Sequence, residues 1–186
     1  MEDTAMLQSA KLKYIFPIGF FLSLFLDGSI NLIFSGSLFA YPYSMVSNLT
    51  ILWLVLGIFF EGETNLPIAT WAAGVGLVFD WYYTGVFGVN MFILPVMVLL
   101  IQWVKVFYKP TFLSILLTFF LALTLYESAF YIVFEMVHYT TITSSVFVAY
   151  NLAPTLALNL CFFVILYLPI KSLFRHTRGA NFRSID

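Results

Sequence analysis

The chain alternates long apolar runs with short polar or glycine-containing breaks. The breaks fall at residues 35–37, 61–63, 84–85, 109–110 and 140–145. A helix of about 20 apolar residues, rising about 1.5 Å per residue, crosses the roughly 30 Å hydrocarbon core of a bilayer. Six segments meet this requirement, approximately 14–34, 42–60, 66–83, 89–107, 112–138 and 145–174. The pattern predicts an all-α membrane protein, with a single transmembrane domain of six helices over residues 1–186.

Composition excludes a water-soluble globular fold. Of the 186 residues, 62% are hydrophobic and 9% are charged, whereas soluble domains carry roughly 25% charged residues. So few charges cannot supply a polar surface, so the lipid bilayer is the expected surrounding. Nucleic acid is not an expected partner, because the net charge is -1. The single cysteine, Cys161, excludes an intrachain disulfide and is expected to be a small buried hydrophobe.

The positions of the basic residues predict the orientation, because cationic loops stay in the cytoplasm. The basic residues are Lys11 and Lys13 before the first segment, Lys105 and Lys109 between the fourth and fifth, and Lys171, Arg175, Arg178 and Arg183 at the end of the sixth and beyond it. With six spans they all fall on one side of the membrane. One helix more or fewer would move at least one cluster across. We therefore expect both termini in the cytoplasm.

Four acidic residues lie within or near the predicted spans: Asp27, Asp80, Glu127 and, at a helix end, Glu135. A charged residue at the centre of a membrane helix costs roughly 2.5–3.5 kcal/mol, so each needs a partner or a neutral form. Asp27, Asp80 and Glu127 each lie roughly 20–23 Å from the cytoplasmic end of their span at helical rise. They are expected to form one layer in the outer half.

Two interpretations of this acidic layer stay open. In the first, the carboxyl groups are satisfied inside the chain by Ser29, Asn31, Asn90, other polar side chains or backbone freed from helices. The sequence Asp27-Gly28-Ser29-Ile30-Asn31 suggests a loosened helix whose amides Asp27 could bind. In the second, the acids contact a partner or a ligand directly.

The sequence favours a protein that is not an enzyme and holds no metal or cofactor. Glu135 and His138 are three residues apart and are expected on one helix face, but a single such pair is only half of a metal site. Asp27 and Asp80 share a depth that intramembrane hydrolysis could use, yet no protease motif adjoins either. No phosphate loop or nucleophile elbow is present.

Small residues recur every four positions in the last segment, at Ala149, Ala153 and Ala157. Such spacing lets two membrane helices approach closely. Packing within the chain and docking of a partner's helix are both possible uses of this face. Pro154, in the same stretch, is expected to mark a kink.

One motif lies between the third and fourth segments, and reads Gly-Leu-Val-Phe-Asp-Trp-Tyr-Tyr-Thr-Gly-Val-Phe-Gly-Val-Asn from Gly76 to Asn90. Gly85 and Gly88 allow a tight reversal between two helices. Asp80 is expected to accept the backbone amides of that turn or to face a partner. The motif resembles the signature of the MreD family of bacterial rod shape-determining membrane proteins. Leu26-Asp27-Gly28-Ser29 is similar to the acidic position in that family's first helix.

The resemblance implies a multi-pass protein of the bacterial cytoplasmic membrane that acts as a non-catalytic scaffold for cell elongation and lateral peptidoglycan synthesis. The implied partners are MreC, the MreB filament, RodA and a class B penicillin-binding protein. Asp27, Ser29, Asp80, Gly85, Gly88 and Asn90 are then the candidate interface or structural polar residues.

The resemblance also implies the compact bundle of the substrate-binding subunits of energy-coupling factor vitamin transporters, and such a subunit is the alternative function. Those subunits carry an Ala-x-x-x-Ala face on the first helix. At that spacing the first segment here has Gly19 and Ser23 and no alanine.

Overall fold

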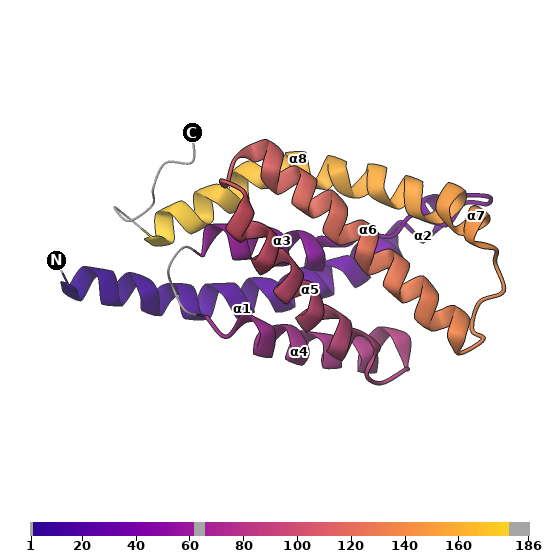
Figure 1. Cartoon of the computed structure of the whole chain (residues 1–186), viewed down its shortest axis with the longest axis horizontal. Helices are drawn as coiled ribbons and strands as arrows, with labels where there is room; N and C mark the ends of the chain where they lie inside the picture. Colours follow the sequence, from indigo (N-terminus) through magenta and orange to yellow (C-terminus); the bar gives the residue numbers. More distant parts are fainter. Residues whose placement is uncertain (1, 62–65, 179–186) are drawn as a thin grey trace.

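The computed structural model describes residues 2–61 and 66–178, and within them all regular structure is helical (Figure 1). The elements are α1 (Glu2–Ile33), α2 (Ser35–Leu38), α3 (Leu49–Phe60), α4 (Ile68–Phe79), α5 (Val89–Phe107), α6 (Phe112–Met136), α7 (Ser144–Val146) and α8 (Ala153–Arg178), with π-helical segments η1 (Asp80–Thr84) and η2 (Phe147–Leu152). In the part of the chain that the structure describes, four helical stretches are long and apolar enough to cross a membrane: Lys13–Ile33, Val89–Phe107, Phe112–Met136 and Ser144–Thr177.

Helix α3 forms the centre of the bundle. All of its 12 residues are buried, and α1, α5, α6 and α8 pack around it. Its sequence is apolar on every face, as expected of a helix that has neighbours on every side. Gly19 of α1 lies against the Trp53 ring, where a Cβ atom would come within 2.0 Å of it, and the Trp53 indole N–H donates to the Phe16 carbonyl at 3.1 Å. Close contact with α1 thus fixes this face of α3.

The predicted second span, 42–60, is wrong at its beginning. Residues 40–48 are not helical, and the helix starts only at Leu49. At 1.5 Å per residue, 12 residues reach about 18 Å, so α3 alone is too short to cross a bilayer. The apolar run that suggested one helix therefore contains two kinds of backbone, a non-helical segment and a short buried helix.

Other predicted boundaries shift less. The fourth segment, 89–107, coincides with α5, and the fifth, 112–138, ends earlier, at Met136. The third, 66–83, is divided between α4 and the π-helical η1. The sixth, 145–174, becomes the continuous run of α7, η2 and α8, in which Pro154 is the second residue of α8, just beyond η2. A wider π turn there suits a proline that cannot donate a backbone hydrogen bond.

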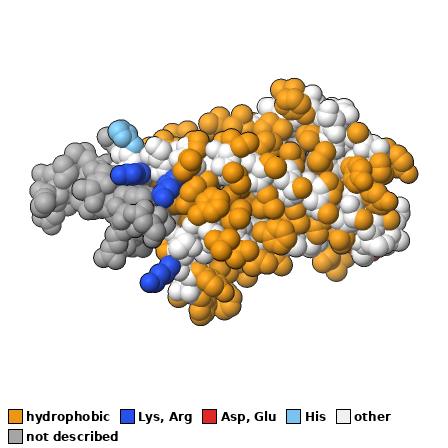
Figure 2. Space-filling model, turned by 90° about the horizontal axis from the view of Figure 1, so that it is seen from above, with side chains coloured by type: hydrophobic (Ala, Val, Ile, Leu, Met, Phe, Trp, Pro, Cys, Tyr) orange, Lys and Arg blue, Asp and Glu red, His pale blue; other side chains and the backbone are white. Residues whose placement is uncertain are grey.

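The start of α1 and the end of α8 lie at the same end of the bundle (Figure 1). Lys and Arg side chains gather at one end of the face in Figure 2, and hydrophobic side chains cover much of the rest. We call the end where the Lys and Arg side chains gather the basic end. Arg183 lies outside the described residues, as do the side chains of Lys11 and Arg178.

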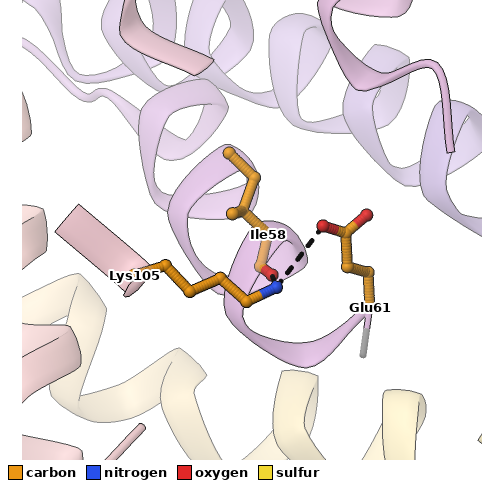
Figure 3. Close-up of polar contacts among 3 residues, drawn as sticks. All are labelled: Ile58, Glu61 and Lys105. Atoms are coloured by element: carbon orange, nitrogen blue, oxygen red, sulfur yellow. Dashed lines mark hydrogen bonds and ion pairs between the residues drawn. The ribbon is translucent and has the colours of Figure 1, made fainter. Parts of the chain in front are cut away.

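At the basic end, Lys105 of α5 binds the last turn of α3 (Figure 3). Its ammonium group donates to the carbonyl of Ile58 and lies 3.4 Å from the Glu61 carboxylate. A cation at a helix C-terminus opposes the negative end of the helix dipole and satisfies a carbonyl that has no partner in the helix. The sequence pattern did not predict this contact.

Candidate functional site

Asp27 binds the beginning of α3 from the neighbouring helix α1. One carboxylate oxygen accepts from the Leu49 backbone N–H at 2.6 Å and from the Ser47 hydroxyl at 2.7 Å. The other accepts from the Thr50 backbone N–H at 2.8 Å and the Thr50 hydroxyl at 2.7 Å. The first N–H groups of a helix lack partners within it, so Asp27 acts as an N-cap supplied by another helix. Its side chain is buried, at 4% exposure.

Each backbone N–H from residue 44 to residue 50, in the non-helical segment and the first two residues of α3, has a hydrogen-bond partner. Beyond the two that Asp27 accepts, Ser44 donates to the Tyr150 carbonyl at 2.8 Å, Met45 to the Leu38 carbonyl at 2.8 Å, Val46 to Thr155 Oγ1 at 3.2 Å, Ser47 to Asn31 Oδ1 at 2.9 Å and Asn48 to Asn159 Oδ1 at 2.8 Å. Irregular backbone is tolerated at membrane depth only where the protein satisfies it. Side chains of α1 and α8, together with the backbone carbonyls of Leu38 and Tyr150, meet that requirement here.

The side chains that hold this segment come as polar pairs four residues apart. Asp27 and Asn31 share one face of α1, and Thr155 and Asn159 share one face of α8. Residues four apart on a helix are neighbours on its surface. Of the four, Thr155 and Asn159 were missed by the sequence analysis. Two polar residues four positions apart in an otherwise apolar helix could have indicated a buried hydrogen-bonding face.

Asp80 accepts backbone N–H groups at the start of α5, as Asp27 does at the start of α3, but within one hairpin. It is fully buried, and it accepts from the backbone N–H of Asn90 at 2.9 Å, of Gly88 at 3.0 Å and of Met91 at 3.1 Å. The Asn90 side-chain amide adds a bond of 2.9 Å. The expectation that Asp80 accepts amides of the turn is confirmed by these contacts.

Two glycines shape this hairpin. Gly85 has φ of 66° and Gly88 has φ of 99°, a region that residues with a Cβ atom rarely adopt. Gly85 ends η1 and Gly88 precedes α5. Their conformation turns the chain so that the start of α5 comes back over Asp80.

The two hydrogen-bonded clusters meet on adjacent residues of α6. The Tyr126 hydroxyl donates to Asn90 Oδ1 at 2.7 Å, which reaches the Asp80 cluster. Glu127 Oε1 accepts from the Asn48 side-chain amide at 2.7 Å, which reaches the Asp27 cluster. We call these connected side chains the polar layer: Asp27, Asn31, Ser47, Asn48, Thr50, Asp80, Asn90, Tyr126, Glu127, Thr155 and Asn159.

Two local expectations are wrong. Helix α1 is not loosened after Asp27 but continues to Ile33, and Ser29 is exposed and donates to the Phe25 carbonyl at 2.8 Å within the helix. Glu135 and His138 do not share a helix face. Helix α6 ends at Met136, and His138 has φ of 59°, a left-handed conformation outside the helix.

The small residues of the last segment point outward. Ala149, Ala153 and Ala157 are all exposed, and so is Cys161, four residues further on. Packing inside the chain therefore does not explain these alanines, and the expectation that Cys161 is buried is wrong. We call these four residues the small-residue stripe. The outward faces of α1, α5 and α6 carry large exposed side chains instead, such as Leu22, Phe92 and Leu121.

The buried polar groups of the polar layer are satisfied by hydrogen bonds within the chain. Within the described residues, every buried side-chain nitrogen or oxygen has a hydrogen-bond partner, and no cluster of three or more metal-ligating side chains is found among them. Asp27 and Asp80 each lie in a separate set of donors rather than facing one another as an acid pair. Such an arrangement stabilises backbone geometry.

The fold and this polar layer define a helical membrane protein in which buried polar groups hold irregular backbone. The family model of rod shape-determining protein MreD matches residues 9–177. The chain belongs to the MreD family, and membership implies a role in rod shape determination. No curated protein and no solved structure matches the chain. The similarity to transporter subunits therefore stays a prediction.

Proposed function

We propose that this chain acts in rod shape determination as a non-catalytic scaffold of the bacterial cytoplasmic membrane. It binds MreC and supports lateral peptidoglycan synthesis together with the MreB filament, RodA and a class B penicillin-binding protein. Family membership supports the cellular role. The polar layer supports a structural role for the buried acids, because the donors that bind Asp27, Asp80 and Glu127 belong to the same chain.

In this proposal the single domain crosses the membrane six times, with both termini in the cytoplasm. Beyond the four long spans, α3 crosses together with the preceding segment 40–48, and α4 crosses together with η1. The described basic residues support the orientation. Lys13 lies in the first half of α1 and Lys171 in the last third of α8, and the start of α1 and the end of α8 lie at the same end of the bundle. Lys105 and Lys109 lie at the end of α5 and just after it. The basic end would face the cytoplasm.

The polar layer would give the scaffold a fixed shape in its outer half. Asp27, Asp80, Asn90, Gly85 and Gly88 serve this role from inside, because they set where α3 and α5 begin. A surface that must hold a partner in one orientation gains from such preorganisation. MreC then contacts the outer faces of these fixed helices and not the buried acids themselves.

The small-residue stripe is the proposed contact surface for the membrane anchor of MreC. Between helices in lipid, association depends on close van der Waals packing, which small residues permit. The stripe spans 12 residues, from Ala149 to Cys161, or about 18 Å of helix. Its exposure is the observation that carries this proposal.

The test is co-purification of MreC with variants of the full chain. Ala153→Leu and Ala157→Leu fill the stripe and are expected to lower the captured MreC by about tenfold, which corresponds to about 1.4 kcal/mol. Val96→Leu is the matched control, because it also adds volume at an exposed helical position, and Val96 is 53% exposed on α5, a different helix from that of the stripe. Equal capture by all three variants, with normal rod shape in a depleted strain, would exclude the stripe as the contact surface.

A further inference from the structure

A cleft of about 410 Å³ opens beside the polar layer, between α1, the segment before α3, and α4 with η1. This volume is in the range of small-molecule binding sites, roughly 300–1,000 Å³. Its lining includes the polar residues Asp27, Asn31, Ser35, Ser47 and Asn48, of which Asp27, Ser47 and Asn48 are buried. The cleft lies on different helices from the small-residue stripe, so its use is independent of the contact proposed for MreC.

Three aromatic side chains line the cleft, Phe39, Phe79 and Tyr83. Tyr83 is set in the π-helical η1 and lies against Gly28 of α1, where a Cβ atom would come within 2.0 Å of its hydroxyl oxygen. Its hydroxyl group is 3.4 Å from the Leu24 carbonyl. Gly28 therefore gives the ring the space in which it forms one wall of the cleft. Single π-helical turns occur often at functional sites.

The electrostatics of the cleft distinguish between ligand classes. Asp27 is the one carboxylic acid among the described lining residues, and none of them is basic. Its four donors are neutral groups, which satisfy hydrogen bonding without supplying a positive charge. An anionic ligand would meet a carboxyl group and no cation. The phosphate group of a phospholipid is disfavoured there for the same reason, since it would have no basic partner.

We propose that this cleft binds an organic cation, an ammonium or guanidinium group carried on an apolar stem. The cation would lie among the faces of the aromatic rings, which attract positive charge, within reach of the negative potential of Asp27. The apolar stem would contact Leu32 and Val46, which also line the cleft. The amide groups of Asn31 and Asn48 would orient the polar part of the ligand. The cation belongs either to a free small molecule or to a basic side chain of another membrane protein.

The first arm of the test uses the purified full chain in lipid nanodiscs and three probes of matched size. Phenethylamine is cationic, phenethyl alcohol is neutral and hydrocinnamate is anionic. Isothermal titration, corrected with protein-free nanodiscs, is expected to show saturable binding of the amine at least about tenfold tighter than of the alcohol, and no binding of the anion. Equal binding of the amine and the alcohol would overturn the proposal.

Variants locate the binding. Phe39→Ala removes an exposed wall residue, and Gly28→Ala pushes the Tyr83 ring from its place. Each should weaken amine binding by about tenfold. Phe92→Ala on α5 and Gly74→Ala on α4 are the controls, because Phe92 is 68% exposed away from the cleft and a Cβ atom at Gly74 meets nothing within 4 Å. Unchanged amine affinity in both cleft variants would place the binding elsewhere and overturn the proposal.

The second arm separates the two sources of the cation. A photo-crosslinking residue replaces Leu32, an exposed residue of the cleft lining, in living cells. Crosslinks to a lysine- or arginine-containing segment of a membrane protein, lost when that basic residue is changed to methionine, would assign the cation to a partner. Amine binding in the first arm without such crosslinks would assign it to a free molecule. Absence of both results would refute the site.

Discussion

Asp27 and Asp80 are both buried carboxyl groups that accept the first backbone N–H groups of another helix, yet they work over different distances along the chain. Asp80 and its amide donors lie 8 to 11 residues apart, inside one hairpin. Asp27 reaches backbone donors 22 and 23 residues away, on a different helix. The Asp80 cluster completes a local turn, whereas the Asp27 cluster fixes where the central helix begins.

The two regions also differ in what supports them besides the carboxyl group. In the hairpin, α4 and α5 touch directly, and a Cβ atom at Gly76 would lie 2.3 Å from the Asn90 carbonyl oxygen. Around Asp27 the neighbouring backbone is non-helical, and side chains of α1 and α8 supply most of its hydrogen bonds. We infer that the Asp27 region depends more strongly on each polar side chain.

Asp27→Ala is expected to have the largest effect. It leaves two buried backbone N–H groups and two hydroxyls without their acceptor, and an unsatisfied buried group costs about 1–3 kcal/mol, so the loss should be about 5 kcal/mol. The folded protein should then be recovered in very low yield after extraction in mild detergent. The measurement is the monodisperse fraction in size-exclusion chromatography and the thermal midpoint.

Ser29→Ala is the control for that experiment, because Ser29 is exposed two residues further along α1 and bonds only within its own helix. It should behave like the natural protein. If Asp27→Ala kept the natural thermal midpoint, Asp27 would not be the group that fixes the start of α3.

Asp80→Ala is expected to be milder, at about 3 kcal/mol. The N–H groups of Gly88 and Met91 are only partly buried, so water can replace part of what Asp80 supplies. The protein should fold, with a lower thermal midpoint and faster proteolysis at the exposed residues 85 and 87. A loss as large as that of Asp27→Ala would remove the distinction between the two regions.

The local nature of the Asp80 cluster and the long range of the Asp27 cluster explain which parts of the site the sequence could predict. The hairpin was foreseen because Asp80, Gly85, Gly88 and Asn90 lie in one short motif whose turn chemistry is local. The partner of Asp27 was not foreseen, because nothing next to Asp27 indicates that its donors are Leu49 and Thr50.

The start of α3 was missed for a related physical reason. The stretch from Pro42 to Asn48 carries no charge and continues into an apolar helix, so hydropathy alone extends the span. Ser44, Ser47 and Asn48 within it are polar, and in lipid they indicate a backbone that needs outside partners. The outward position of the small-residue stripe was also undetermined, since spacing shows that residues share a face but not which neighbour the face meets.

Gly76→Ala tests the direct helix contact of the hairpin and should have the smallest effect of the three. Its Cβ atom would meet the Asn90 carbonyl oxygen at 2.3 Å and the Met91 nitrogen at 2.7 Å, both of which are backbone atoms. Because backbone cannot rotate away, α4 must move from α5, at an expected loss of about 2 kcal/mol. Gly74→Ala, two residues earlier on the same helix, meets nothing within 4 Å and should gain about 0.5–1 kcal/mol from helix propensity. Opposite shifts of the two thermal midpoints would show that the hairpin is held by close packing as well as by Asp80, whereas matching shifts would leave Asp80 as its main support.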